Sequence, residues 1–206
     1  LRVWHEKREP RRRPLAADWF HIGCDIENSQ PTRGLPPDGE ATLKIVGKAP
    51  TVLMVSTIEP RKGYGQTLDA FELLWSQGQN VHLVVVGKRG WNVDPLIKRL
   101  AAHKERGKRL FWLEGISDEY LDRLYAAANV VLMASEGEGF GLAIVEGARH
   151  GKPLILRDIP VFREIAGKHA FYFRGDTPEE LAKALREWFS LRAARRTPSS
   201  QGIKAL

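Results

Sequence analysis

Six short apolar runs alternate with stretches of helical periodicity through the second and larger part of this chain. The runs read as buried strands, and they cover residues 51–56, 81–87, 110–113, 129–134, 153–157 and 170–173. Between them apolar residues recur every three or four positions, as in amphipathic helices. Strands that alternate with helices form a parallel sheet with helices on both faces and right-handed crossovers. The sequence therefore predicts an α/β fold with a doubly wound, Rossmann-like sheet of six parallel strands.

The order of the strands predicts where a ligand binds. In the usual order, 3-2-1-4-5-6, strands 1 and 4 are neighbours at the point where the winding reverses. Ligands of such sheets bind there, beyond the carboxyl ends of the strands. We therefore expect the loops that follow the first and the fourth strand to carry the chemistry.

The loop after the fourth strand is a glycine-rich turn that leads into a helix. It reads Glu136-Gly-Glu-Gly-Phe-Gly141, and the helix is expected over about 141–150. The first N–H groups of a helix lack internal partners, so this turn is suited to bind an anion. Glu138 lies in the turn and Glu146 about two helical turns further on, among apolar neighbours. The pattern suits a ligand with central phosphates and hydroxyl groups at both ends, such as a nucleotide-diphosphate sugar.

The loop after the first strand supplies cations. Arg61 and Lys62 stand directly before Gly63, where the next helix opens. An Arg-Lys pair is ordinarily two exposed cations, but this position favours neutralisation of a diphosphate.

Other residues near this edge keep two interpretations each. Glu136 belongs either to the rim of the site or to the solvent. Ile116 and Asp118 follow the third strand and would line a base pocket through backbone groups, although Asp118 is equally a candidate helix cap. Residues 87–90 could touch phosphate, but a surface turn is favoured. The six tryptophans are interpreted as core or interface residues: Trp4, Trp19, Trp75, Trp91, Trp112 and Trp188.

Charge is concentrated at the two ends of the chain. The net charge is +7, while residues 1–13 and 192–206 each carry +4. The nearly neutral body argues against a nucleic-acid partner. The basic ends leave room for contact with an anionic membrane surface, but a solvated tail is favoured.

Cys24 is the single cysteine, so we expect no internal disulfide and a cytoplasmic location, at the inner face of the membrane if the ends bind lipid. No cysteine–histidine cluster suggests a metal site.

With these motifs the chain resembles the C-terminal, donor-binding domain of retaining glycosyltransferases of the GT-B fold, family 4. The matching motifs are Ile58-Glu-Pro-Arg-Lys-Gly63, Glu138-Gly-Phe-Gly-Leu142 with Glu146, and the strand entry 147–153. The resemblance divides the chain into a tail and interdomain connector (1–45), a donor-binding domain (46–191) and a basic C-terminal tail (192–206). Within the first part, His21, Gly23 and Asp25 resemble the family's connector.

The resemblance implies a role for each matched residue. Glu138 would bind the donor sugar beside the reacting carbon and is the catalytic candidate, while Glu146 would bind the ribose. The amides around Gly139, Phe140, Gly141 and Leu142 would hold phosphate or sugar. The loop of Arg61, Lys62 and Gly63 would bind the diphosphate.

The resemblance also implies a reaction: transfer of a sugar, with retention, to a polysaccharide or lipid-linked acceptor, without an obligatory metal or cofactor. GDP-mannose is the first expectation for the donor. Ser56-Thr57 stand where many members have Gly-Arg, and Arg61 is the expected substitute. The family's N-terminal acceptor domain is missing, so we expect little turnover by this chain alone. The alternatives are a sugar-nucleotide epimerase of the same architecture and a non-catalytic nucleotide-binding module.

Overall fold

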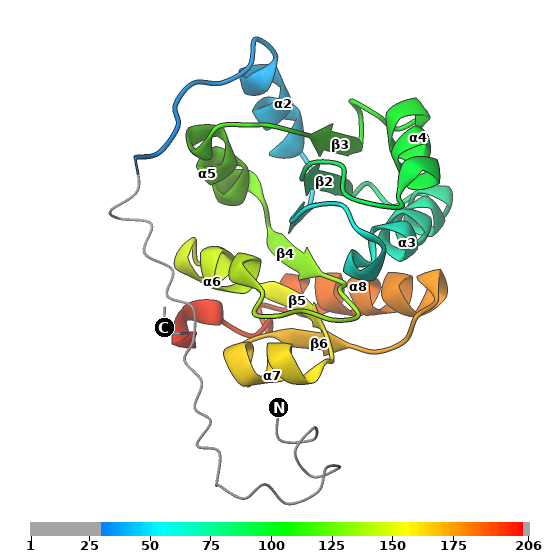
Figure 1. Ribbon diagram of the computed structural model, residues 1–206. Helices are drawn as coiled ribbons and strands as arrows, with labels where there is room; N and C mark the ends of the chain where they lie inside the picture. The colour runs from blue at the N-terminus through cyan, green and yellow to red at the C-terminus, as the bar shows by residue number, and fades with distance from the viewer. Residues whose placement is uncertain (1–29, 204–206) are drawn as a thin grey trace, which may run out of the picture.

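The computed structural model describes residues 30–203 and contains one sheet of six parallel strands (Figure 1). The strand order is β3-β2-β1-β4-β5-β6, so the predicted order is confirmed. Val52 and Leu53 of β1 pair with β4, which places the reversal of winding between these two strands. The strands are β1 (Thr51–Val55), β2 (His82–Val86), β3 (Leu110–Leu113), β4 (Val130–Met133), β5 (Leu154–Arg157) and β6 (Phe171–Phe173).

Seven helices among the described residues cover the sheet, and each face of the sheet has its own apolar core. Side chains alternate between the faces along each strand. Val52 and Met54 therefore pack in one core, and Leu53 between them packs in the other. The first core lies under α3 (Tyr64–Ser76), α4 (Asp94–Ala102) and α8 (Pro178–Ala193). The second lies under α2 (Gly39–Val46), α5 (Asp118–Ala127), α6 (Leu142–Arg149) and α7 (Pro160–Ala166).

Helix α2 was not predicted. It lies almost wholly within residues 1–45, which were expected to form a tail and interdomain connector. It is only eight residues long, and it lies between a Pro/Gly-rich segment and Pro50. Its buried residues are Gly39, Thr42 and Val46, and it packs on α5. Only one of the three is strongly apolar, so the helical period was too weak to detect.

Helix α4 ends at Ala102, because His103 takes an extended conformation at the C-cap. The segment from residue 192, expected as a solvated tail, is exposed at residues 193–196 but partly folded in its described part. Helix α8 runs on to Ala193, and a 3-10 turn (Ser200–Gly202) then lies against α6, with Ser200 buried. Residues 1–29 and 204–206 lie outside the described part, with them Trp4, Trp19, His21, Gly23, Cys24 and Asp25.

The tryptophans divide between core and surface. Trp75 and Trp188 are buried and Trp112 is half-buried against the first core. Trp91 is 62% exposed, so of the two interpretations, core or interface, the core is excluded for this residue. No helix in residues 30–203 combines the length and the apolar character needed to cross a bilayer.

Candidate functional site

The loops that follow β1 and β4 meet at the carboxyl edge of the sheet through one carboxylate. The Lys62 ammonium is hydrogen-bonded to Glu138 Oε1, and Arg61 Nη1 lies 3.1 Å from Glu138 Oε2. Arg61 Nη1 also donates to the Gly137 carbonyl at 2.7 Å. In the same loop as Glu138, the Ser135 hydroxyl donates to Oε1 at 2.9 Å. The predicted convergence of the two loops is therefore present as an ion-paired cluster.

Glu138 is charged at neutral pH although its side chain is only 6% exposed. Burial by itself would raise the pKa of this carboxyl group. Hydrogen bonds from Lys62, Ser135 and Arg61, together with the charge of Lys62, outweigh burial and hold the pKa below its ordinary value. The carboxylate therefore serves as a fixed negative charge and not as a proton donor.

A cavity of about 430 Å³ opens beside this cluster. Seven of the ten predicted site residues line it: Arg61, Lys62, Glu138, Phe140, Gly141, Leu142 and Glu146. Its remaining walls come from the ends of β1 and β4 and from the first turn of α6, through Val55, Ser56, Thr57, Glu59, Met133 and Ala143.

Three predicted residues, Gly63, Gly139 and Ile116, are not among those that line the cavity. Gly63 has a structural role instead. Its φ is +71°, and a Cβ there would collide with the carbonyl oxygen of Ala134. Only glycine lets the two loops approach this closely. Ile116 packs against the second core, because its side chain belongs to the apolar face under α5.

Helix α6 presents its amino end and Glu146 to the cavity. Gly141, at φ +92°, is the N-cap and provides no side-chain hydrogen bond. The next two residues, Leu142 and Ala143, line the cavity at the start of the helix, where backbone N–H groups attract anions. Glu146 lies one to two turns further along, and its Oε2 accepts a hydrogen bond from the Tyr125 hydroxyl at 2.8 Å. An anion-binding helix end and an oriented carboxylate thus share one cavity.

The end of β1 contributes groups that the sequence did not predict as part of the site. Ser56 and Thr57 line the cavity. The buried hydroxyl of Tyr64 donates to the Ser56 carbonyl at 2.8 Å and lies 2.8 Å from Ser56 Oγ. Burial raises the pKa of Tyr64, so this hydroxyl stays protonated. The position of Ser56 and Thr57 after strand 1 was the available signal.

Arg157, at the end of β5, was also missed, and it supports the loop that carries Glu138. This buried guanidinium donates to the Ala134 carbonyl at 2.9 Å, directly before that loop. It also bonds to the carbonyl of Gly175 and to the side chains of Asp176 and Gln66. A lone arginine at the end of an apolar run gives no sequence signal for such a role.

Glu136, Asp118 and residues 87–90, which kept two interpretations each, all lie outside the lining of the cavity. Glu136 is exposed and does not line the cavity. The cap of α5 is Ser117, which accepts from the Tyr120 N–H, and not Asp118. Asp118 instead accepts hydrogen bonds from the Thr32 N–H and hydroxyl, both at 2.8 Å, and these bonds lower its pKa. Residues 87–90 form a turn bonded to the β1 loop, since the Gly90 N–H donates to the Ile58 carbonyl.

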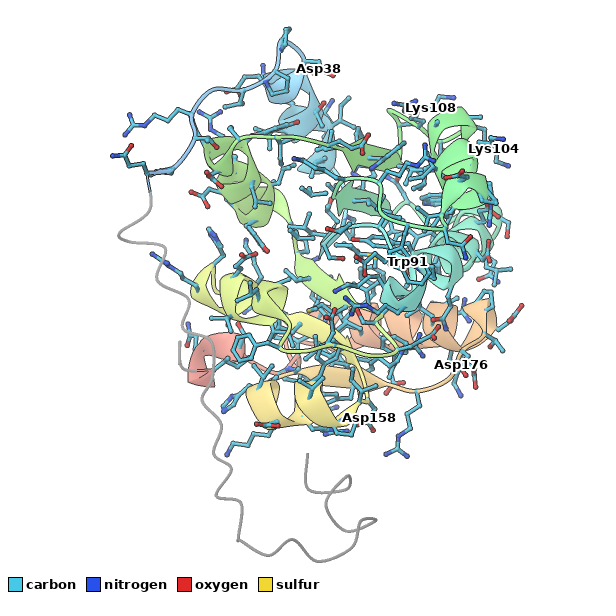
Figure 2. The ribbon with its side chains drawn as sticks, in the orientation of Figure 1. Asp38, Trp91, Lys104, Lys108, Asp158 and Asp176 are labelled. Carbon is cyan, nitrogen blue, oxygen red and sulfur yellow. The ribbon has the colours of Figure 1, made fainter. Side chains whose placement is uncertain are left out.

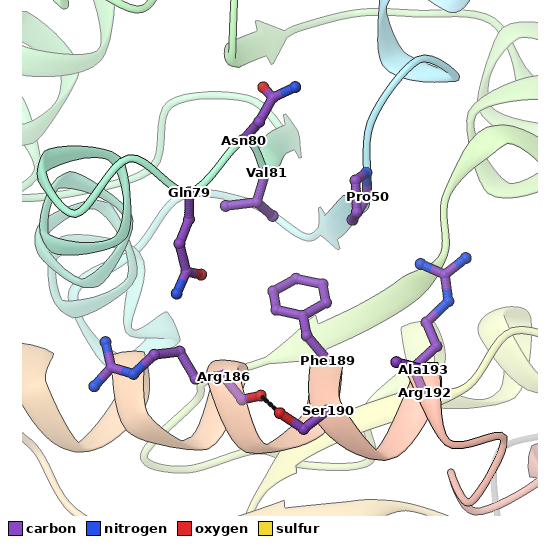
Figure 3. A pocket seen from close by; sticks show the side chains of 9 residues that line it. All are labelled: Pro50, Gln79, Asn80, Val81, Arg186, Phe189, Ser190, Arg192 and Ala193. Carbon is purple, nitrogen blue, oxygen red and sulfur yellow. Dashed lines mark hydrogen bonds between the residues drawn. The ribbon is translucent and has the colours of Figure 1, made fainter.

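A larger cavity of about 690 Å³ lies at the opposite, amino end of the sheet (Figure 3). Phe189 and Arg192 of α8 border it, opposite Pro50 and Val81 before β1 and β2. It contains no carboxylate and lies far from the switch point, so the smaller cavity is the better candidate. Across residues 30–203, no three His, Cys, Asp or Glu side chains gather as a metal site requires.

The doubly wound sheet with a charged cavity at its switch point is the C-terminal half of a GT-B glycosyltransferase fold. The chain belongs to the family of group 1 glycosyl transferases, whose model matches residues 39–205.

A curated relative supports the family, and two solved structures share the fold. The serotype-specific mannosyltransferase WbdA of Escherichia coli is 49% identical over 192 residues, which are 93% of this chain and 24% of that protein. The C-terminal domain of a group 1 glycosyl transferase from Francisella tularensis superposes with a TM-score of 0.62 at 19% identity, covering 81% of this chain and 89% of that domain. Anabaena HepE, solved with UDP and glucose, gives 0.62 at 22% identity over 82% of this chain and 46% of its own. The chain thus spans about a quarter of WbdA.

Proposed function

We propose that this chain is the donor-binding half of a retaining mannosyltransferase that uses a nucleotide-diphosphate sugar, with GDP-mannose as the expected donor. The observation that carries the proposal is the cavity at the switch point, which Arg61 and Lys62 line together with the first residues of α6. Two cations and a helix N-terminus suit a diphosphate. The 49% identity to a protein named as a mannosyltransferase supports the choice of sugar.

In the proposed complex each end of the donor meets one carboxylate. Glu146, already oriented by Tyr125, would accept hydrogen bonds from the ribose hydroxyls. Glu138 would lie beside the sugar, where a fixed negative charge stabilises the positive charge that develops at the reacting carbon. The diphosphate would lie between them, against Lys62 and the first turn of α6.

The proposed reaction replaces one bond at the anomeric carbon with another on the same face of the sugar. The bond to the diphosphate oxygen breaks, and its electron pair leaves with the diphosphate. An acceptor hydroxyl bonds to that carbon, and its proton passes to the departing diphosphate oxygen. The cations and helix N–H groups stabilise the leaving charge, so no metal is required. We propose that the acceptor, a polysaccharide or lipid-linked glycan, is bound by the part of the enzyme that precedes this domain.

Calorimetric titration of the chain with GDP, UDP and ADP tests the proposal. One nucleotide should bind selectively, and Glu146→Ala should weaken it by about 1–3 kcal/mol, because the ribose loses hydrogen bonds to a charged group. Glu136→Ala is the matched control: it removes a nearby exposed carboxylate and should leave the affinity unchanged. If neither the chain nor the full-length protein binds any of the three at millimolar concentration, the proposal is wrong.

A further inference from the structure

Two large hydrophobic side chains in the described part of the chain are exposed, and both stand beside the candidate site. Trp91 is 62% exposed and Leu142 is 45% exposed. A single exposed hydrophobic residue is ordinary on a protein surface. Here Leu142 lines the cavity, and Trp91 follows a turn that is hydrogen-bonded to the β1 loop, which also lines it.

The turn after β2, which leads into Trp91 (Figure 2), packs against the β1 loop that lines the cavity. The Gly90 N–H donates to the Ile58 carbonyl at 3.0 Å, and the Ile58 N–H donates to the Lys88 carbonyl at 2.9 Å. A Cβ on Gly90 would lie 2.9 Å from Glu59 Cγ and 3.1 Å from Thr57 Cγ2. Glu59 and Thr57 line the cavity, so the residue before Trp91 packs directly on its wall.

The backbone that carries Trp91 is held in place on both sides. The Arg89 N–H donates to Glu114 Oε1 at 3.0 Å, and the Arg89 guanidinium pairs with Asp94 at 2.5 Å. On the other side Val93 is buried in the first core. An indole on an anchored turn, with only two rotatable side-chain bonds, loses little entropy when a ligand contacts it.

We propose that Trp91 is a stacking platform for the pyranose ring at the reacting end of the carbohydrate acceptor, the rest of which is bound by the preceding part of the enzyme, with Leu142 as a second apolar contact. This inference rests on the proposed function, since it requires a sugar to be transferred at this cavity. One face of a pyranose presents C–H groups, which fit the electron-rich face of an indole, while its hydroxyl groups stay in water. A protein partner would need a far larger apolar surface than these two residues supply.

Steady-state kinetics of the full-length protein that carries this chain test the platform. Trp91→Ala should raise the acceptor KM about three- to tenfold, because the ring contact is lost. Trp91→Phe should stay near the wild-type value, whereas Trp91→Leu, which keeps apolar area but no ring, should behave like Trp91→Ala. The donor KM and the calorimetric affinity for the nucleotide should change less than twofold in all three variants.

The control variant Lys98→Ala removes an exposed side chain of the neighbouring helix α4, and it should keep wild-type kinetics. An unchanged acceptor KM in Trp91→Ala, with nucleotide binding intact, would refute the platform and leave the proposed function standing. Equal acceptor KM values for the Phe and Leu variants would show that an aromatic ring is not needed at this position, which also refutes the platform. A wild-type protein that binds no nucleotide would remove the proposed function and the platform together.

Discussion

Lys62 shows how one side chain can serve both the folded structure and a ligand. Its ammonium is hydrogen-bonded to Glu138 in a nearly buried position, yet it also lines the cavity. An ammonium carries three donors, and Glu138 Oε1 takes one of them. Lys62 can therefore keep Glu138 ionised and still donate to a phosphate oxygen.

Replacement of Lys62 by Met keeps the aliphatic stem and removes the charge. We expect Lys62→Met to weaken a nucleoside diphosphate at least tenfold and the matching monophosphate less than threefold, because Lys62 is placed to contact the terminal phosphate. Calorimetric titration with both nucleotides measures the two effects. Lys168→Met, at an exposed lysine after α7, is the control. Equal losses for the two nucleotides would exclude contact with the terminal phosphate.

At the scale of elements, the junction of the β1 loop with α3 sets how closely the two halves of the site approach. Gly63 is both the N-cap of α3 and the point of contact with Ala134 at the end of β4. Its left-handed conformation turns the chain so that Lys62 faces the cavity and Tyr64 enters the core. A backbone contact of this kind fixes the distance between Lys62 and the loop of Glu138.

Two neighbouring glycines offer a matched pair of substitutions. Gly63→Ala should destabilise the fold by about 2–4 kcal/mol, because a left-handed alanine is strained and its Cβ collides with Ala134. Gly65→Ala, inside the first turn of α3 with open space around its Cα, should be neutral or about 0.5 kcal/mol stabilising. Urea denaturation measures both free energies of unfolding. Similar values for the two variants would show that the contact at Gly63 is unimportant.

For the whole molecule, Arg157 connects parts of the chain that are distant in sequence. It joins β5 to the end of β4, to the turn at Gly175 that precedes α8, and to Gln66 of α3. Its guanidinium also lies 5.0 Å from the ring centroid of Phe173. These bonds tie the β4 loop, which carries Glu138, to α3 and to the turn before α8.

Loss of Arg157 should therefore weaken the whole fold. We expect Arg157→Leu to lower the free energy of unfolding by about 3 kcal/mol, because buried carbonyl groups lose their donors. The control is Arg174→Leu at a side chain that is 85% exposed, where loss of the bond to Asp158 should cost less than about 1 kcal/mol. Denaturation in urea compares the two variants. A loss below 1 kcal/mol for Arg157→Leu would contradict the role assigned to it.

The sequence by itself determined the fold class, the strand order and the two loops of the site. The strands and the start of α6 can be recognised from residues that are adjacent in the sequence. These are the six apolar runs and the glycine-rich turn Glu136–Gly141. Only the tertiary structure decided which side chains share the cavity. The contact of Gly63 with Ala134 and the bonds of Arg157 join segments up to 91 residues apart. Helix α2 and the exposed position of Trp91 likewise have no local pattern that predicts them. Such contacts depend on how loops pack on one another, and a lone arginine or tryptophan in the sequence does not reveal its partner.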